Sequence, residues 1–252
     1  MKNTSSTHVL GEGTMGDIQF EFNLDKLIHT IAYFCHQNVD GLTKLKVAKM
    51  LYFADKKHLL EFGAPIIGDV YFCMEFGPVP SFALNEMNEA INRSEVVCSG
   101  CSDYSKMSLV LRVKRSLFSK YPHFEAKQDF DASVFAQSEI DVLRYVAQEY
   151  GRRSAKQLVD LTHNEPTWRI ANELRGPNSR TPIPYELFFE GAPQESRKHL
   201  ARLKAEFCGE AIEMPGDPEY RAFAGEMASY DFEPSLELDK DQIRRRGVSH
   251  SA

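Results

Sequence analysis

Two short segments carry the residue types of an acid–base site. Asp55 and His58 lie three positions apart, so a helix would place both on one face, and His163 precedes Glu165 by two positions. A histidine beside a carboxylate can move protons in catalysis. The sequence supplies neither a nucleophile elbow, nor a glycine-rich phosphate loop, nor a His-Glu-x-x-His zinc helix to accompany them. We therefore predict no catalytic residue, and keep an enzyme in which these four residues converge as the third of three hypotheses.

A Cys-x-x-Cys pair, Cys98 and Cys101, is the second candidate for chemistry. A structural zinc site needs four ligands, yet no second pair follows, and His123 alone cannot complete the set. A redox pair would stand at a strand-to-helix junction, whereas this one lies in a polar segment. We predict an incidental pair of cysteines, with no metal and no cofactor.

Composition limits the class of protein. The chain has 252 residues, 42% of them hydrophobic, and a formal net charge of -6, which argues against non-specific binding of nucleic acid through a broad basic face. Five scattered cysteines do not form a secreted disulfide pattern, no apolar run approaches the roughly 20 residues of a membrane span, and the first residues do not resemble a signal peptide. We expect a cytoplasmic protein.

The elements that would position these residues begin with two helices. Asn23 is a good N-cap for a helix whose apolar residues run from Leu24 to Phe34. Thr43 can cap a second helix, which Gly63 would end. That second helix is apolar almost all round and includes Tyr52, Asp55 and His58, which predicts a central place in the fold.

An extended segment and a proline elbow follow. Residues 69–74 are predicted to be extended, and the elbow consists of Glu75, Phe76, Gly77, Pro78, Val79 and Pro80. Two prolines so close together are not expected inside a regular strand ladder. Ser81 is predicted to cap the next helix, and short strands at 96–97, 109–113 and 118–124 are expected to form an antiparallel hairpin or small sheet.

Three further helices are predicted from their caps. Ser138 with Asp141 suggests a capping box for a helix that ends at Gly151, and Ser154 with Gln157 suggests another. Pro166 would open a third helix, which contains Trp168. The first two helices outline a helix–turn–helix with basic residues nearby, so a DNA-binding regulator using residues 139–162 is the second hypothesis.

These elements predict an α+β fold: a mainly α-helical globular domain with a small antiparallel β-sheet or hairpin. We expect a disordered leader over residues 1–19, the main domain over 20–176, a helical C-terminal extension over 177–234 with a last helix at 195–212, and a disordered tail over 235–252.

Four motifs in order resemble the Panacea domain, found in SocA-like antitoxins of type II toxin–antitoxin systems of bacteria and phages. The first is the helix from Leu45 to Leu59, with a Lys-x-x-Lys start. The second is Gly63-Ala64-Pro65-Ile66, the third is the elbow, and the fourth is Leu161-Thr162-His163-Asn164-Glu165-Pro166-Thr167-Trp168. Phe76 stands where tyrosine or histidine is more usual in the family.

The resemblance implies an antitoxin that neutralises a cognate toxin by direct protein contact, and for some members an adaptor that delivers the toxin to a ClpXP-type protease. It does not identify the toxin. Rigid prolines and exposed aromatic side chains suit an interface. Our predicted partner-binding residues are Tyr52, Asp55, His58, Glu75, Phe76, Gly77, Pro78, Val79, Pro80, His163, Glu165 and Trp168.

Overall fold

A computed structural model describes residues 18–95, 105–115, 120–175 and 180–208. The chain divides into two compact units, 1–211 and 212–252, and every described residue belongs to the first. Several predictions lie outside the described residues: nearly all of the 1–19 leader, the 96–97 strand, the Cys98–Cys101 pair, the end of the last helix and the 235–252 tail. The predicted domain boundaries stay a prediction.

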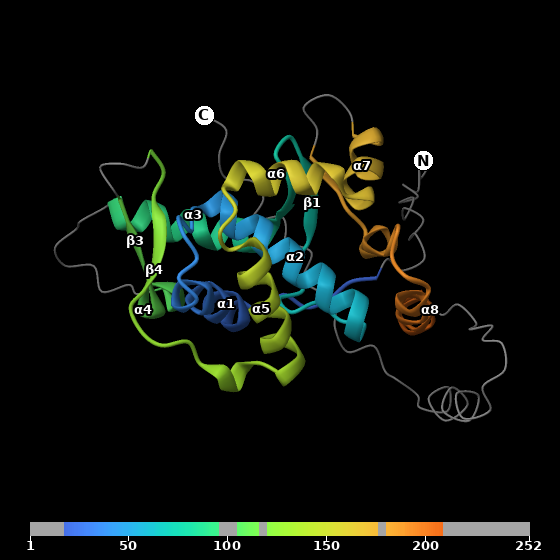
Figure 1. Cartoon of the computed structure of the whole chain (residues 1–252), viewed down its shortest axis with the longest axis horizontal. Helices are drawn as coiled ribbons and strands as arrows, with labels where there is room; N and C mark the ends of the chain where they lie inside the picture. The colour runs from blue at the N-terminus through green and yellow to red at the C-terminus, as the bar shows by residue number, and fades with distance from the viewer. Residues whose placement is uncertain (1–17, 96–104, 116–119, 176–179, 209–252) are drawn as a thin grey trace, which may run out of the picture. The chain divides into compact units, whose positions relative to one another are not determined.

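The described residues confirm a mainly helical α+β fold (Figure 1). The helices are α1 (Leu24–His36), α2 (Lys44–Phe62), α3 (Ser81–Glu95), α4 (Lys106–Val110), α5 (Gln137–Tyr150), α6 (Ala155–Asn164), α7 (Pro166–Glu173) and α8 (Gln194–Cys208), with the 3-10 helices η1 (Ala132–Val134) and η2 (Tyr185–Phe189). The strands are β1 (Tyr71–Met74), β2 (Gly77–Pro80), β3 (Leu111–Lys114), β4 (His123–Ala126) and β5 (Thr181–Pro182). Among these residues, no helix is long and apolar enough to cross a membrane.

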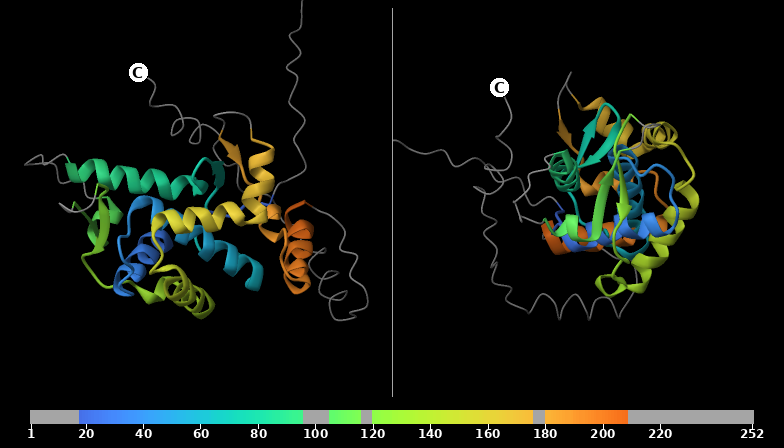
Figure 2. Two further views of the ribbon diagram at one scale, coloured as in Figure 1. Left: turned by 45° about the horizontal axis from the view of Figure 1, so that its top comes forward. Right: turned by 90° about the vertical axis from the view of Figure 1, so that its left-hand side faces the viewer.

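Helix α2 is the centre of the domain, as its all-round apolar pattern predicts. The Thr43 side chain accepts from the Lys46 N–H at its start, and Gly63 ends it in a left-handed conformation with φ of 78°. The helix packs against α3, α5, α6, α8 and strand β2, and both figures show it running among them (Figures 1 and 2). Its burial therefore organises the elements that follow it in the chain.

Two buried lysines of α2 bind backbone carbonyl groups. Lys46 Nζ donates to Asp40 O at 2.5 Å and Gly151 O at 2.7 Å, which connects the turn after α1 to the end of α5. Lys49 Nζ donates to Pro78 O at 2.6 Å and so holds strand β2. Burial lowers the pKa of Lys49 to about 7. These lysines of the Lys-x-x-Lys pattern thus fasten loops and strands to the central helix.

The elbow prediction was wrong in one respect, because both prolines lie in a strand. β2 pairs antiparallel with β1, with Pro78 opposite Cys73 and Pro80 opposite Tyr71. The sheet order is β2-β1-β5, so β2 is at an edge, where proline is tolerated. Backbone N–H groups along a strand point alternately toward and away from the neighbouring strand. The nitrogens of Pro78 and Pro80 point away from β1, so the absence of their N–H groups removes no hydrogen bond between β1 and β2.

Two helix starts also differ from prediction. Asp69, and not Ser81, caps α3: its carboxylate accepts from Phe82 N at 2.9 Å and Ala83 N at 2.7 Å. A residue 12 positions before Ser81 reaches the helix because the β1–β2 hairpin folds back between them.

The start of α5 lies two residues earlier than predicted, because its N-cap is Ala136 and not Ser138. Glu139 supplies the contact, since its carboxylate accepts from Ala136 N at 2.8 Å and pairs with Lys26 of α1 at 2.6 Å. The predicted box of Ser154 and Gln157 at α6 is confirmed.

The predicted hairpin is confirmed as the antiparallel pair β3–β4, although its limits shift. Residues 109 and 110 belong to the short helix α4, and β4 begins only at His123. Arg112 and Glu125 face each other across the two strands, with Arg112 Nε 3.0 Å from Glu125 Oε2.

The segment after residue 180 completes the core. Strand β5 pairs with the other edge of β1, and the buried Phe188 of η2 packs its ring against Tyr52 and Tyr71. Tyr185 Oη donates to Asp69 O at 2.7 Å. The central aromatic cluster therefore includes residues far along the chain from α2.

We predict that the buried amine of Lys49 gives stability a distinct pH dependence. The unfolded chain, with a lysine pKa near 10.5, binds the proton more readily than the folded one, so stability rises with pH above about 7. Burial raises the pKa of Asp55 to about 7 and that of Asp69 to about 6, so their contributions to stability fall as pH rises, and Lys49→Met is the reference in which both remain. The unfolding free energy of wild type relative to Lys49→Met should rise between about pH 7 and 9, by at most about 1.4 kcal/mol per pH unit.

Urea unfolding of both proteins at each pH measures this difference. A difference that stays constant with pH would show that the folded protein does not lower the pKa of Lys49.

Candidate functional site

Asp55 lies fully buried on α2 and holds the loop that follows the helix. Its carboxylate accepts from Ile66 N and Ile67 N, both at 2.9 Å, and from Tyr71 Oη at 3.0 Å. Burial raises the pKa of Asp55 to about 7, against the opposing effect of its hydrogen-bond donors. Every oxygen of this carboxylate is engaged with the protein itself.

His58, one turn further along α2, forms a separate set of contacts. Its Nδ1 lies 2.6 Å from Ala64 O, and its Nε2 lies 3.1 Å from Ser138 Oγ. A carbonyl oxygen can only accept, so Nδ1 carries the hydrogen, and Nε2 of the neutral ring accepts from the serine hydroxyl. Burial lowers the pKa of His58, which favours that neutral form. The ring thereby joins the end of α2 to the start of α5.

Tyr52 is the third predicted site residue on α2, and it is fully buried. Its ring meets those of Phe53, Tyr71 and Phe188 at centroid distances of 5.4 to 5.8 Å. The three signature residues of this helix thus lie inside the domain and offer a partner no exposed group in this structure.

The tip of the β1–β2 hairpin does reach the surface. Met74, Glu75 and Phe76 are all exposed, and Phe76 retains 56% of its accessible area. Gly77 then takes φ of 92°, and a Cβ at this position would lie 2.4 Å from Thr162 Oγ1 and 3.0 Å from Lys49 Nζ. Glycine alone tolerates both this positive φ and the lack of space for a Cβ, so the close approach of the hairpin to α2 and α6 depends on Gly77.

Trp168 of α7 stands against this tip. Its indole stacks on His163, with ring centroids 3.9 Å apart and planes 17° apart, and Nε1 donates to Met74 O at 3.2 Å. Burial, and next the charge of Lys49, lower the pKa of His163. Both rings are half-buried, so they are held in place and still present an outer face.

Glu165 sets the position of α7. It forms an ion pair with Lys56 of α2, and the same Lys56 amine donates to Thr167 Oγ1 at 3.0 Å. Thr167 in turn donates to Leu187 O at 3.0 Å. This chain of contacts holds the start of α7, and with it Trp168, against the core.

The predicted residues therefore fall into a buried set and a surface set. We name the exposed set the hairpin–Trp168 surface: Met74, Glu75 and Phe76 with the outer faces of His163 and Trp168. Within β2, Gly77, Pro78 and Pro80 are buried and Val79 is half-buried. The two predicted acid–base pairs do not converge, because the Asp55 carboxylate and the His58 ring bond to different groups and His163 is stacked on Trp168. Among the described residues, no group of three or more metal-ligating side chains could hold an ion.

Sequence reasoning missed the role of Lys46, Lys49 and Asp69. A signal was available for the lysines, because both fall within an otherwise apolar stretch of a helix predicted to be central. Asp69 gave no such signal, since its partners lie across a hairpin whose pairing was not foreseen.

The helix–turn–helix outline is present as α5 and α6, but its basic residues are partly matched by acids. Arg144 pairs with Asp141 at 2.8 Å and Arg153 with Glu149 at 2.5 Å. The local positive charge is therefore smaller than the count of basic residues suggests.

Fold and site together define a mainly helical α+β domain with a packed signature helix and an exposed aromatic surface. The family model described as the antitoxin SocA-like, Panacea domain matches residues 47–169. This match confirms the resemblance drawn from the four motifs. No curated protein and no solved structure matches the chain. Strand β5, η2 and α8 pack on this domain from beyond the matched segment.

Replacing Asp55 by alanine should destabilise the fold strongly. The change leaves two N–H groups and one hydroxyl buried without an acceptor, so we expect a loss of about 3–5 kcal/mol in unfolding free energy by urea denaturation. Asp160→Ala, an exposed aspartate of α6, is the matched control and should change it by less than about 0.5 kcal/mol. A loss below about 1 kcal/mol for Asp55→Ala would contradict this role.

Trp168 is the single tryptophan of the chain, so its fluorescence reports on the stack with His163. The folded pKa of His163 lies below 6.5, so the proton binds more readily once the ring leaves the stack, and the stack weakens as pH falls below that value. We expect acid to change Trp168 emission in the wild type but not in His163→Phe, which can stack without titrating. The same emission change in both proteins would show that His163 does not cause it.

Proposed function

We propose that this protein is an antitoxin that neutralises a cognate protein toxin by direct binding through the hairpin–Trp168 surface. The match to a SocA-like antitoxin domain supports the general role. The observation that carries the choice of surface is the hairpin tip, where Phe76 is exposed and Met74 O accepts from Trp168, whose indole is also fixed by its stack on His163.

The rigidity of this surface favours tight binding. Aromatic side chains that are already ordered lose little conformational freedom on association, so more of the contact energy remains as affinity. Trp168 is fixed by two contacts, and Phe76 stands at the end of two paired strands that Lys49 and Gly77 hold against the core. Tryptophan and other large aromatic groups are also the residues that dominate the energetics of many interfaces.

The buried signature residues have a supporting role in this proposal. Tyr52, Asp55 and His58 support the surface from within, because Asp55 holds Tyr71 at the start of β1 and Lys56, one residue later, pairs with Glu165 beside α7. Substitution of these residues would disturb binding through the fold. We infer that the protein acts in the cytoplasm, where its proposed toxin partner would be made.

DNA binding through residues 139–162 is less well supported than protein binding. The acids beside Arg144 and Arg153 reduce the local positive charge, and the chain as a whole is acidic. This alternative predicts binding to operator DNA that weakens steeply with salt, which a titration at two salt concentrations can test.

We predict that Phe76→Ala abolishes or strongly weakens neutralisation while the fold stays intact. The toxin to use is the product of the neighbouring gene, co-expressed with the antitoxin. Truncation of a central aromatic anchor should lower affinity by about thirtyfold or more, measured by calorimetry, with little change in melting temperature because the side chain is largely exposed. Tyr121→Ala removes a similarly exposed aromatic group from the segment before β4 and should retain affinity.

The opposite pattern, with Phe76→Ala still protecting cells and Tyr121→Ala failing, would place the interface elsewhere. Co-expression in cells that lack ClpXP separates two modes of action. Protection that persists there indicates steric inhibition, whereas protection that is lost indicates delivery of the toxin to the protease.

A further inference from the structure

The β3–β4 hairpin and its flanks reverse the overall charge of the chain. Residues 105–127 contain six lysines and arginines and a single acid, Glu125, whereas the whole chain has a formal net charge of -6. A charge reversal confined to one element of a fold is the pattern expected of a local surface that binds anions. The six cations are Lys106, Arg112, Lys114, Arg115, Lys120 and Lys127.

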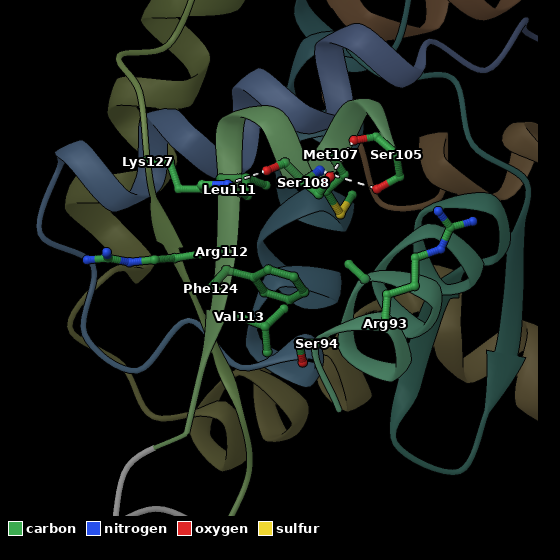
Figure 3. Close-up of a pocket in the computed structure, with 11 residues that line it drawn as sticks. Arg93, Ser94, Ser105, Met107, Ser108, Leu111, Arg112, Val113, Phe124 and Lys127 are labelled. Carbon is green, nitrogen blue, oxygen red and sulfur yellow. Dashed lines mark hydrogen bonds between the residues drawn. The ribbon is translucent and has the colours of Figure 1, made fainter. Parts of the chain in front are cut away.

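The two faces of this hairpin differ in character. Leu111 and Phe124 are buried, and together with Val113 they line the hollow between the hairpin and α3 (Figure 3). Side chains alternate along a strand, so Arg112 and Lys114 belong to the opposite, outer face, and Figure 3 shows Arg112 directed away from the hollow. The apolar face thus anchors the hairpin to the domain, and the outer face meets solvent.

Cations outnumber acids on this outer face. The register of the two strands places Glu125 opposite Arg112 and His123 opposite Lys114. Glu125 lies 2.9 Å from Arg112 Nη2 and 3.0 Å from Lys114 Nζ, so one carboxylate offsets two positive charges. The Arg112 and Lys114 side chains remain 61% and 57% exposed. Their shared acid therefore orders them along the strand and leaves a net positive charge.

Lys127 and Lys120 extend the positive charge toward the two ends of the hairpin. Lys127 follows β4, and its Nζ donates to a neutral acceptor, Ser108 O, at 2.7 Å. Lys120 precedes β4, with its Nζ 5.6 Å from the centre of the Tyr121 ring. Within the described part of the chain, neither amine pairs with a carboxylate. We name four exposed cations the basic ribbon: Arg112, Lys114, Lys120 and Lys127.

Duplex DNA matches this arrangement better than an acidic protein does. It carries one negative charge per about 1.7 Å of helix axis, so a row of cations meets phosphates in any register. The major groove of B-DNA also admits a two-stranded antiparallel ribbon, whereas the major groove of an RNA duplex is too deep and narrow for side chains to read. An acidic protein would need its carboxylates placed opposite each cation.

We propose that the outer face of the β3–β4 hairpin binds duplex DNA, with the two strands in the major groove and the basic ribbon on the phosphates. Contacts of this kind position a protein on DNA and carry no sequence information by themselves. The remaining acidic surface repels DNA, so the contact is confined to this face. The inference is independent of the proposed antitoxin function, because no residue of the basic ribbon belongs to the hairpin–Trp168 surface.

The test follows the fluorescence anisotropy of a short fluorescein-labelled DNA duplex of arbitrary sequence as full-length protein is added at several salt concentrations. Because four cations face phosphates, the logarithm of the affinity should fall with the logarithm of the salt concentration with a slope of about -3. An RNA duplex of the same sequence should bind less tightly, because its major groove does not admit the hairpin.

Two variants locate the contact. The double change Arg112→Gln with Lys114→Gln should bring the slope closer to zero by about 2 and lower affinity at low salt by about tenfold or more. Glu125→Gln removes the single acid and should raise affinity by about threefold or more. A gain in affinity is a result that a purely structural role of this ion pair does not produce.

The charge-matched control is Arg152→Gln with Lys156→Gln, which removes two exposed cations from the helix–turn–helix outline at 139–162. Affinity and slope should both stay close to those of the wild type. Melting temperatures of all variants are compared by circular dichroism. If the double variant at Arg112 and Lys114 fails to fold, Lys120→Gln with Lys127→Gln serves in its place.

Four results would overturn the proposal. Affinity that does not change with salt would exclude phosphate contacts, and equal affinity for the RNA duplex would exclude the DNA groove. Loss of binding in the control, with binding retained in the basic-ribbon variant, would assign the DNA to residues 139–162. Displacement of the DNA by polyglutamate at an equal concentration of negative charge would assign this face to an acidic protein.

Discussion

The buried carboxylate of Asp55 needs hydrogen bonds inside the protein, because a charge buried without partners is strongly destabilising. Ile66, Ile67 and Tyr71 supply those bonds, so the loop after α2 and the start of β1 take their positions from one side chain. Lys49 imposes the same requirement on β2 through Pro78 O. The central helix thus organises its surroundings through polar groups as well as through apolar packing.

Because these polar residues are buried, the residues that identify the domain in a sequence are largely different from the residues that can contact a partner. The motifs that identify a Panacea domain consist largely of residues that face inward, and the exposed groups are few and lie at the hairpin tip and on α7. A signature of this kind reports which fold is present. The identity of a partner depends on the small number of side chains that the fold presents at its surface.

Local signals predicted much of this fold, and long-range contacts account for the rest. The caps at Asn23, Thr43 and Ser154 and the proline at the start of α7 depend on neighbours within four residues, so those helices could be placed from the sequence. The pairing of β2 with β1 could not be read in this way, and neither could the stack of His163 on Trp168. Of the predicted partner-binding residues, those on α2 proved to be buried, because an apolar helix pattern does not tell which polar residues it takes inward.

The prolines of β2 have a consequence for how this surface can change over time. Pro78 and Pro80 occupy the positions of β2 whose nitrogens point away from β1, and proline has no N–H. The β2 edge of the sheet therefore lacks the N–H groups with which an incoming strand would pair. A partner at the hairpin must then be recognised by side chains, and backbone pairing, which would accept many sequences, is closed to it. Substitutions at Met74, Glu75 or Phe76 could therefore alter specificity while the scaffold persists, which would let such a protein follow a diverging partner one residue at a time.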